Sequence, residues 1–189
     1  MSAATTKLMT AEEFFEWQDR AEDQDKRFEL VRGEIEEMPS PGERHGVVCA
    51  NVAWVLGSFV RQRKKGYILS NDPGIVLERD PDTVRGPDVV LFEGLRSYAD
   101  LNPKFAEGVP TLAVEVLSPH DRIGKVTRRI DQFLKSGIGL VWLVDPESKD
   151  VTVYRADKKP YVLGETEELS GDDILPDFRC KVADFFFVS

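Results

Sequence analysis

Two short apolar segments of the chain each carry one carboxylate. Asp88 opens the run over residues 88–92, and Glu115 stands inside the run over residues 111–117, with apolar neighbours on both sides. An ionised carboxylate in such surroundings is costly unless a cation or hydrogen bonds compensate its charge. Two carboxylates held about 4 Å apart would repel by roughly 4 kcal/mol at an effective dielectric constant near 20. A hard divalent cation such as Mg²⁺ or Mn²⁺ would remove that repulsion, so the pair is a candidate metal site.

An ion pair is the competing interpretation of the same residues. Glu115 would then pair with an arginine, Arg85 or Arg129, and Asp88 would cap the end of a strand. Buried acidic side chains are generally paired in this way. The pattern alone leaves the metal site and the ion pair both open.

Three further side chains are weaker candidates. His45 lies at the start of a predicted helix, where a lone histidine is more often a cap or a surface residue than a catalyst. Glu29 and Glu34 flank a tight turn between two predicted strands. Both are expected to face solvent unless one of them turns toward Asp88 and Glu115.

Several common signatures of other active sites are absent from the sequence. Ser118 is not framed by Gly-x-Ser-x-Gly, and the chain has neither a GxGxxG fingerprint nor a P-loop. With two histidines, and with Cys49 and Cys180 far apart, the spacing indicates neither a zinc site nor a disulfide framework.

Three helices are predicted around these residues. Thr10 and Glu13 have the spacing of a capping box and begin a helix over about residues 10–20. Apolar residues at three- and four-residue spacing predict helices over residues 45–65 and 121–136, each followed by a glycine.

The remaining apolar segments predict a mixed sheet. Short runs rich in β-branched residues, bounded by glycine, proline or aspartate, are typical of strands. They cover residues 27–31, 34–38, 67–70, 74–77, 88–92, 111–117, 140–144, 151–155 and 160–163. The order predicts an α/β (α+β) domain over residues 10–189, with helices packed on a central mixed sheet and the tail over 182–187 folded back onto it. Residues 1–9 are expected to be a flexible N-terminus.

Length and composition limit the class of protein. The chain has 189 residues, of which 41% are hydrophobic and 31% charged, as expected for one globular domain. No apolar run approaches the ~18 residues of a membrane span, so no membrane partner is expected. The N-terminus lacks a secretory signal and the cysteines form no CxxC pair, which predicts a reducing, cytoplasmic location.

The charge balance bears on nucleic-acid binding. The chain has 25 Lys+Arg and 34 Asp+Glu residues, and its net charge of −9 argues against tight, sequence-independent binding to nucleic acid. Two basic clusters stand out locally, residues 61–65 and the group Arg122, Lys125, Arg128 and Arg129. Their simplest interpretation is solvated helix surface, although a local basic face can still meet DNA.

Five segments together resemble a known family. They are residues 27–34, 39–46, 85–89, 114–119 and 141–146, and in this order they resemble the Uma-two family of endonucleases in the PD-(D/E)XK nuclease-like superfamily. The resemblance extends from about residue 10 to residue 186. It implies a restriction-endonuclease-like core, in which a central mixed β-sheet is flanked by helices.

The resemblance also implies an active site. Asp88, Glu115 and the carbonyl of Val116 would hold Mg²⁺ (or Mn²⁺), which would activate a water for attack on a phosphodiester of DNA. Glu29 would be the third carboxylate of the superfamily, with Glu34 as its substitute, and His45 matches a recurrent family position. Nucleases of the superfamily that cut both strands often form homodimers, so a homodimer is an expected partner state.

One departure from the superfamily pattern keeps other functions open. The usual lysine would stand at position 117, which is Leu117 here. Arg129 aligns with a lysine that has moved to the following helix, but arginine is nearly always protonated and cannot act as a base. Lys125, one turn earlier on the same helix face, is the preferred substitute. One alternative is a catalytically inactive nuclease-fold module that binds DNA or a protein partner. Another is a protein whose acidic face binds a partner protein and whose Asp/Glu pair is only a buried ion network.

Overall fold

The structure is a computed structural model that describes residues 8–20 and 26–188. Its helices are α1 (Ala11–Arg20), α2 (Glu43–Arg63) and α3 (Ile123–Lys135), with the 3-10 helices η1 (Tyr98–Asp100) and η2 (Val182–Phe186). All three predicted α-helices are therefore confirmed. The expected flexible segment 1–9 lies outside the described residues up to residue 7.

A six-stranded sheet forms the centre of the molecule. Its strand order is β10-β9-β8-β7-β6-β3, and only β7 and β8 run parallel, so the predicted mixed sheet is confirmed. The strands are β3 (Tyr67–Ser70), β6 (Val89–Phe92), β7 (Leu112–Val116), β8 (Leu140–Asp145), β9 (Asp150–Arg155) and β10 (Lys158–Gly164).

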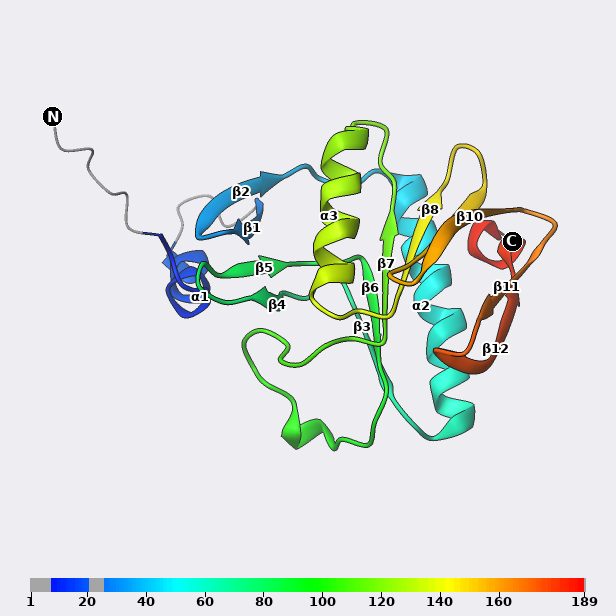
Figure 1. The fold of residues 1–189 in the computed structure, drawn as a ribbon, viewed down its shortest axis with the longest axis horizontal. Coiled ribbons are helices and arrows are strands. Elements are labelled where there is room, and N and C mark those ends of the chain that lie inside the picture. The colour runs from blue at the N-terminus through cyan, green and yellow to red at the C-terminus, as the bar shows by residue number, and fades with distance from the viewer. Residues whose placement is uncertain (1–7, 21–25, 189) are drawn as a thin grey trace, which may run out of the picture.

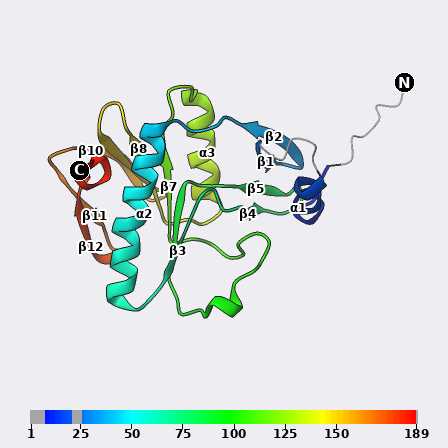
Figure 2. The same cartoon turned by 180° about the vertical axis from the view of Figure 1, so that it is seen from behind.

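Helices α2 and α3 cover opposite faces of this sheet, as the front and back views show (Figures 1 and 2). Side chains alternate between the two faces along each strand. Val89 and Val114 pack in one core cluster with α2, whereas Val90 and Ala113 pack in another with α3. Glu115 is two residues after Ala113 in the same strand, so its side chain also lies on the face of the sheet that α3 covers.

A second, four-stranded sheet extends from one side of the molecule (Figure 1). Its order is β2-β1-β5-β4, formed by β1 (Arg27–Val31), β2 (Glu34–Met38), β4 (Ile75–Glu78) and β5 (Thr83–Arg85). The sequence did not predict β5, which has only three residues. Leu30 of β1 pairs with Val84 of β5, so the neighbouring residues Glu29 and Arg85 come to lie opposite each other.

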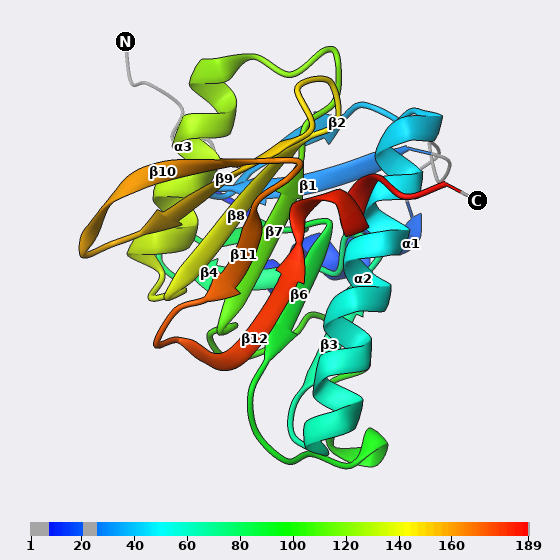
Figure 3. The same ribbon diagram turned by 90° about the vertical axis from the view of Figure 1, so that its right-hand side faces the viewer.

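The C-terminal segment adds a two-stranded sheet that the sequence also did not predict. It consists of β11 (Glu168–Gly171) and β12 (Leu175–Lys181), and the side view shows it beside the central sheet (Figure 3). The tail then packs against α2, where the side-chain amide of Asn51 donates to the carbonyls of Phe185 and Phe187 at 3.0 and 2.9 Å. This confirms the predicted packing of the tail.

Among the described helices, none is both long and apolar enough to cross a membrane.

Candidate active site

Most of the predicted site residues meet at one end of the central sheet. A cavity of about 360 Å³ opens where β6 begins and β7 ends, beside the first turns of α2 and α3. The predicted residues that line it are His45, Asp88, Glu115, Val116, Lys125 and Arg129. The remaining candidate, Glu29, does not line this cavity but contacts Arg129 behind it.

Asp88 is fixed in place by two contacts. Its Oδ2 accepts a hydrogen bond from the backbone N–H of Val116 at 2.7 Å, and His45 Nε2 lies 3.2 Å from its Oδ1. Burial by itself raises the pKa of Asp88, but His45 and the Val116 N–H favour the carboxylate, so the pKa is lowered overall. Burial also lowers the pKa of His45, yet Asp88 outweighs that effect and the pKa of His45 is raised. Asp88 is thus an oriented carboxylate at the edge of the cavity.

The carboxylate of Glu115 has fewer compensating contacts than that of Asp88. Its Oε2 forms an ion pair with Arg129 Nε at 2.6 Å, while its Oε1 is buried and has no hydrogen-bond partner among the described residues. Burial raises the pKa of Glu115 to about 8, and the charges of Asp88 and Glu29 add to the rise against the opposing charge of Arg129. One oxygen of this carboxylate therefore remains available to a further cation.

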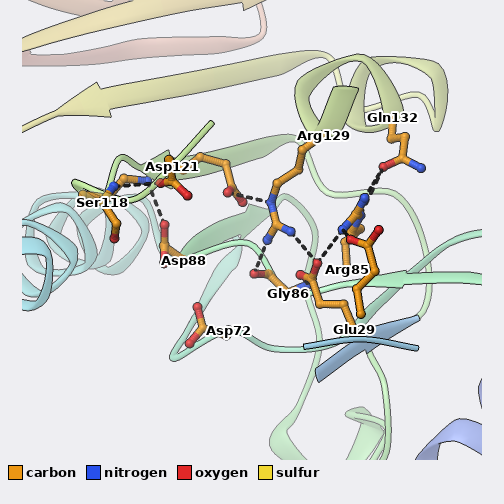
Figure 4. Close-up of polar contacts among 12 residues, drawn as sticks. Glu29, Asp72, Arg85, Gly86, Asp88, Ser118, Asp121, Arg129 and Gln132 are labelled. Atoms are coloured by element: carbon orange, nitrogen blue, oxygen red, sulfur yellow. Dashed lines mark hydrogen bonds and ion pairs between the residues drawn. The ribbon is translucent and has the colours of Figure 1, made fainter. Parts of the chain in front are cut away.

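Glu29 is held by two guanidinium groups (Figure 4). Its Oε2 lies 2.7 Å from Arg85 Nη1 and 2.5 Å from Arg129 Nη1, and its Oε1 accepts the N–H of Gly86 at 2.7 Å. Arg85 in turn donates to Gln132 Oε1 on α3 at 2.8 Å. Burial opposes ionisation, but the two arginines and the Gly86 N–H lower the pKa of Glu29. Glu29 is thus buried, whereas Glu34, its alternative in the sequence, is exposed.

The structure contains the ion pair that competed with the metal site. Glu115 pairs with Arg129, which was one of the two arginines considered, while Arg85 pairs with Glu29 instead. This pairing leaves Glu115 with one oxygen, the buried Oε1, that has no hydrogen-bond partner among the described residues. Asp88 contacts His45 and the Val116 N–H and, within the described part of the chain, no guanidinium group. Carboxylate oxygens suit a hard divalent cation, so the residues present fit Mg²⁺ or Mn²⁺.

The basic residue that contacts the carboxylates is Arg129 rather than Lys125. Arg129 is 9% exposed, and its Nη2 also donates to the carbonyl of Gly86 at 2.7 Å. Its pKa is raised by Glu115 and Glu29 despite burial, so it stays protonated. Lys125 lies one turn earlier on α3, where it is exposed and lines the same cavity.

Two nearby residues were missed by sequence reasoning. Asp72 follows β3, and the pairing of Ser70 with Val89 brings it beside Asp88. Its Oδ2 pairs with Arg27 Nη2 at 2.6 Å, and burial together with Asp88 raises its pKa to about 6 although Arg27 opposes the rise. The available signal was a carboxylate two residues after the end of a strand, which becomes informative only once the partner of that strand is known.

Cys49 is the second missed residue. It lies one helical turn after His45, with its Sγ 3.4 Å from Nδ1 of that histidine. The spacing of four residues on one helix face was visible in the sequence. Without a third ligand, however, this spacing did not indicate a site.

The two basic clusters lie at opposite ends of the molecule. Arg122, Lys125 and Arg128 are exposed and line the cavity. Residues 61–65 lie at the far end of α2, away from the start of α3 (Figure 1). Only the first cluster can therefore contact a ligand at the cavity.

Comparison with known proteins agrees with this architecture. A crystal structure described as "a putative nuclease belonging to DUF820" from Anabaena variabilis ATCC 29413 superimposes with a TM-score of 0.75 at 22% sequence identity. The match covers 94% of this chain and 97% of that one. At this identity the similarity shows the fold, and it confirms the mixed α/β architecture. None of the curated proteins matches the chain.

The family comparison covers most of the chain. Residues 11–183 match the Uma2 (Uma-two) family, whose description is "Putative restriction endonuclease". This range includes all five segments on which the resemblance rests, and it confirms that resemblance. The chain therefore belongs to the Uma2 family.

Proposed function

We propose that the protein is an endonuclease that hydrolyses phosphodiester bonds of DNA with the help of Mg²⁺ or Mn²⁺. The observation that carries this proposal is the convergence of Asp88 and Glu115 at one cavity, with Glu115 Oε1 left without a partner among the described residues. Membership of the Uma2 family supports the same reaction class.

Asp88, Glu115 and the Val116 carbonyl would hold the cation. When bound, the cation lowers the pKa of a coordinated water and offsets charge on the phosphate. His45 and the Val116 N–H keep Asp88 ionised and oriented. Groups that hydrogen-bond to a metal ligand, rather than to the metal, orient that ligand and tune its affinity for the metal.

Arg129 is suited to bind an anionic group rather than to transfer a proton. Its guanidinium joins Glu115 to Glu29 and remains protonated, so it can stabilise a phosphate but cannot act as a base. Glu29 is a positioning residue, because it holds Arg129 from the side that faces away from the cavity.

The exposed residues Arg122, Lys125 and Arg128 would bind the DNA backbone. They lie along the start of α3 at the rim of the cavity, where the phosphate next to the metal ligands would run. Basic side chains at such a rim contribute affinity without reading the base sequence.

Nicking of supercoiled plasmid DNA tests the proposal. We expect nicking in Mg²⁺ or Mn²⁺, and a loss of at least about 100-fold in Asp88→Asn and Glu115→Gln, because each change removes an anionic ligand. Asp131→Asn on the exposed side of α3 is the matched control and should keep wild-type activity. Intact plasmid with the folded wild-type protein in both metals would contradict the proposal.

A catalytically inactive nuclease-fold module is the second candidate, and two observations favour it. Leu117 replaces the usual lysine, and Arg129 already occupies one oxygen of Glu115. This candidate predicts no site-specific binding of a hard cation. Calorimetric titration with Mn²⁺ separates the two functions, since heat that is lost in Glu115→Gln supports the nuclease and excludes the inactive module.

A further inference from the structure

A second group of metal-ligating atoms adjoins the carboxylate pair. His45 and Cys49 lie four residues apart on one face of α2, and Asp88 reaches them from the start of β6. One ligand atom from each of the three residues lies within 4.8 Å of the other two. The group joins an imidazole, a thiol and a carboxylate, which hard-cation sites do not combine.

We propose that His45, Cys49 and Asp88 form a binding site for a borderline-soft divalent cation of the Zn²⁺ class. Mixed nitrogen, sulfur and oxygen donors are the ligands that such cations take in tetrahedral sites. Sites with three protein ligands leave the fourth position for water or substrate. His45 and Asp88 both line the cavity, so a water or substrate group from the cavity could take that position.

The distances fit a compact tetrahedral site. With typical zinc–ligand bond lengths, neighbouring ligand atoms of a tetrahedron lie about 3.4–3.6 Å apart. His45 Nε2 lies 3.2 Å from Asp88 Oδ1 and 4.0 Å from Cys49 Sγ, which brackets this range. Two of the three separations are therefore close to the required spacing before any cation binds, and the third, between the ligand atoms of Cys49 and Asp88, is within 4.8 Å.

The surroundings favour a cation and disfavour a free thiolate. Burial raises the pKa of the Cys49 thiol well above its ordinary value, and the charges of Asp88, Asp72 and Glu115 add to the rise. A nucleophilic cysteine needs the opposite environment, with positive charge near the sulfur. A divalent cation among these carboxylates would replace the proton of the thiol, since a metal-bound cysteine is a thiolate.

The proposed site shares Asp88 with the hard-cation site but uses different partners. Glu115 and the Val116 carbonyl belong only to the hard-cation site, whereas His45 and Cys49 bind directly only in the soft-cation site. The two cations would therefore compete for Asp88. A Zn²⁺-class cation should displace Mn²⁺ from wild-type protein.

Cobalt titration tests the proposal independently of nuclease activity. The probe is Co²⁺ added to the reduced, metal-free full chain, because a cobalt–thiolate bond gives an intense near-ultraviolet charge-transfer band. We expect one equivalent of Co²⁺ to produce the band and one equivalent of Zn²⁺ to remove it. Cys49→Ser should abolish the band, and His45→Gln should weaken Co²⁺ binding at least tenfold.

The chain supplies its own controls for this experiment. Cys180 is the other free cysteine and is likewise half-buried, so Cys180→Ser should keep the band unchanged. Glu115→Gln removes a ligand of the hard-cation site but should also keep the band. The proposals for the two sites can therefore be rejected independently of each other. Absence of the band in wild-type protein, its persistence in Cys49→Ser or its loss in Cys180→Ser would overturn the proposal.

Discussion

At the scale of single residues, the site depends on how two guanidinium groups are shared between the carboxylates of Glu29 and Glu115. Glu29 contacts both Arg85 and Arg129, whereas Glu115 contacts only Arg129. Burial raises the pKa of both groups, but two arginines lower the pKa of Glu29 overall, whereas Arg129 alone does not offset the burial of Glu115, and its pKa is raised to about 8. Both oxygens of Glu29 are hydrogen-bonded, while Glu115 keeps one oxygen without a partner among the described residues.

Removal of Arg129 should destabilise the protein strongly. Arg129→Ala would leave Glu29 with one guanidinium and Glu115 with none, and loss of one partner of a buried ion pair costs about 3–5 kcal/mol. Urea unfolding measures this change in the free energy of unfolding. The neighbouring Arg128→Ala is the matched control, because Arg128 is exposed and its loss should cost less than about 0.5 kcal/mol. Equal stability of the two variants would refute this account of Arg129.

The lowered pKa of Glu29 predicts a stability loss in acid. Because its folded pKa lies below the ordinary value of 4.5, Glu29 stabilises the fold above about pH 4.5. This contribution is lost as the pH falls through the lower pKa of the folded state. The stability gap between wild-type protein and Glu29→Gln should therefore narrow below pH 4.5 in urea unfolding. Glu34→Gln, at an exposed position of the same hairpin, is the control and should change the free energy of unfolding by less than about 0.5 kcal/mol. A constant gap for Glu29→Gln would contradict the prediction.

Sequence reasoning found part of the site for a physical reason. Asp88 and Glu115 were identifiable because a charged residue in an apolar strand needs compensation, whatever compensates it. Asp72 and Cys49 were not, because their importance depends on which strand pairs with β6 and on which helix faces Asp88. The contact of Arg129, rather than Lys125, with Glu29 and Glu115 likewise depends on burial of one helix face, which spacing alone could not decide.

At the scale of elements, the pattern of apolar residues predicted the helices and the buried strands, whereas the shortest strands were not predicted. The three helices have apolar faces or caps that spacing reveals, and the buried strands β6, β7 and β8 are apolar except for Glu115 in β7 and the terminal Asp145 of β8. By contrast, β5 has three residues, and β11 and β12 pair through an irregular register between Ser170 and Gly171. Their pairing is decided by tertiary contacts, so propensity could not predict them.

The turn between β1 and β2 should tolerate only glycine at position 33. Gly33 has a φ of +80°, and a Cβ at this position would lie 2.6 Å from Leu8 Cβ. Gly33→Ala should therefore lower the free energy of unfolding by about 1–3 kcal/mol. Gly124→Ala in α3 is the control, since no atom lies within 4 Å of its added Cβ, and stability there should stay equal or rise by up to about 1 kcal/mol. Thermal unfolding with no loss in Gly33→Ala would contradict this view of the turn.

At the scale of the whole molecule, a net charge of −9 coexists with one basic rim at the cavity. The acidic remainder limits non-specific binding, so DNA affinity should depend on the few cations at that rim. DNA affinity should therefore depend on where the basic side chains lie rather than on the net charge of the protein.

Paired charge removals test the rim. Arg122→Gln with Lys125→Gln should weaken DNA binding and reduce the slope of log affinity against log salt by about 2, one unit for each phosphate left without its basic side chain. Fluorescence anisotropy without Mg²⁺ or Mn²⁺ measures this slope while no cleavage occurs. Arg61→Gln with Lys64→Gln removes the same charges from exposed positions at the far end of α2 and should leave the slope unchanged. An equal effect of both pairs would show that only overall charge matters.

The most direct measurement is anomalous diffraction from crystals of the protein soaked in Mn²⁺. The account predicts one strong anomalous peak within coordination distance of the carboxylates of Asp88 and Glu115 and of the Val116 carbonyl. A well-ordered crystal with no peak at this position, or with Mn²⁺ bound only elsewhere, would show that Arg129 is the sole counter-ion of Glu115 and that the hydrolytic mechanism is wrong.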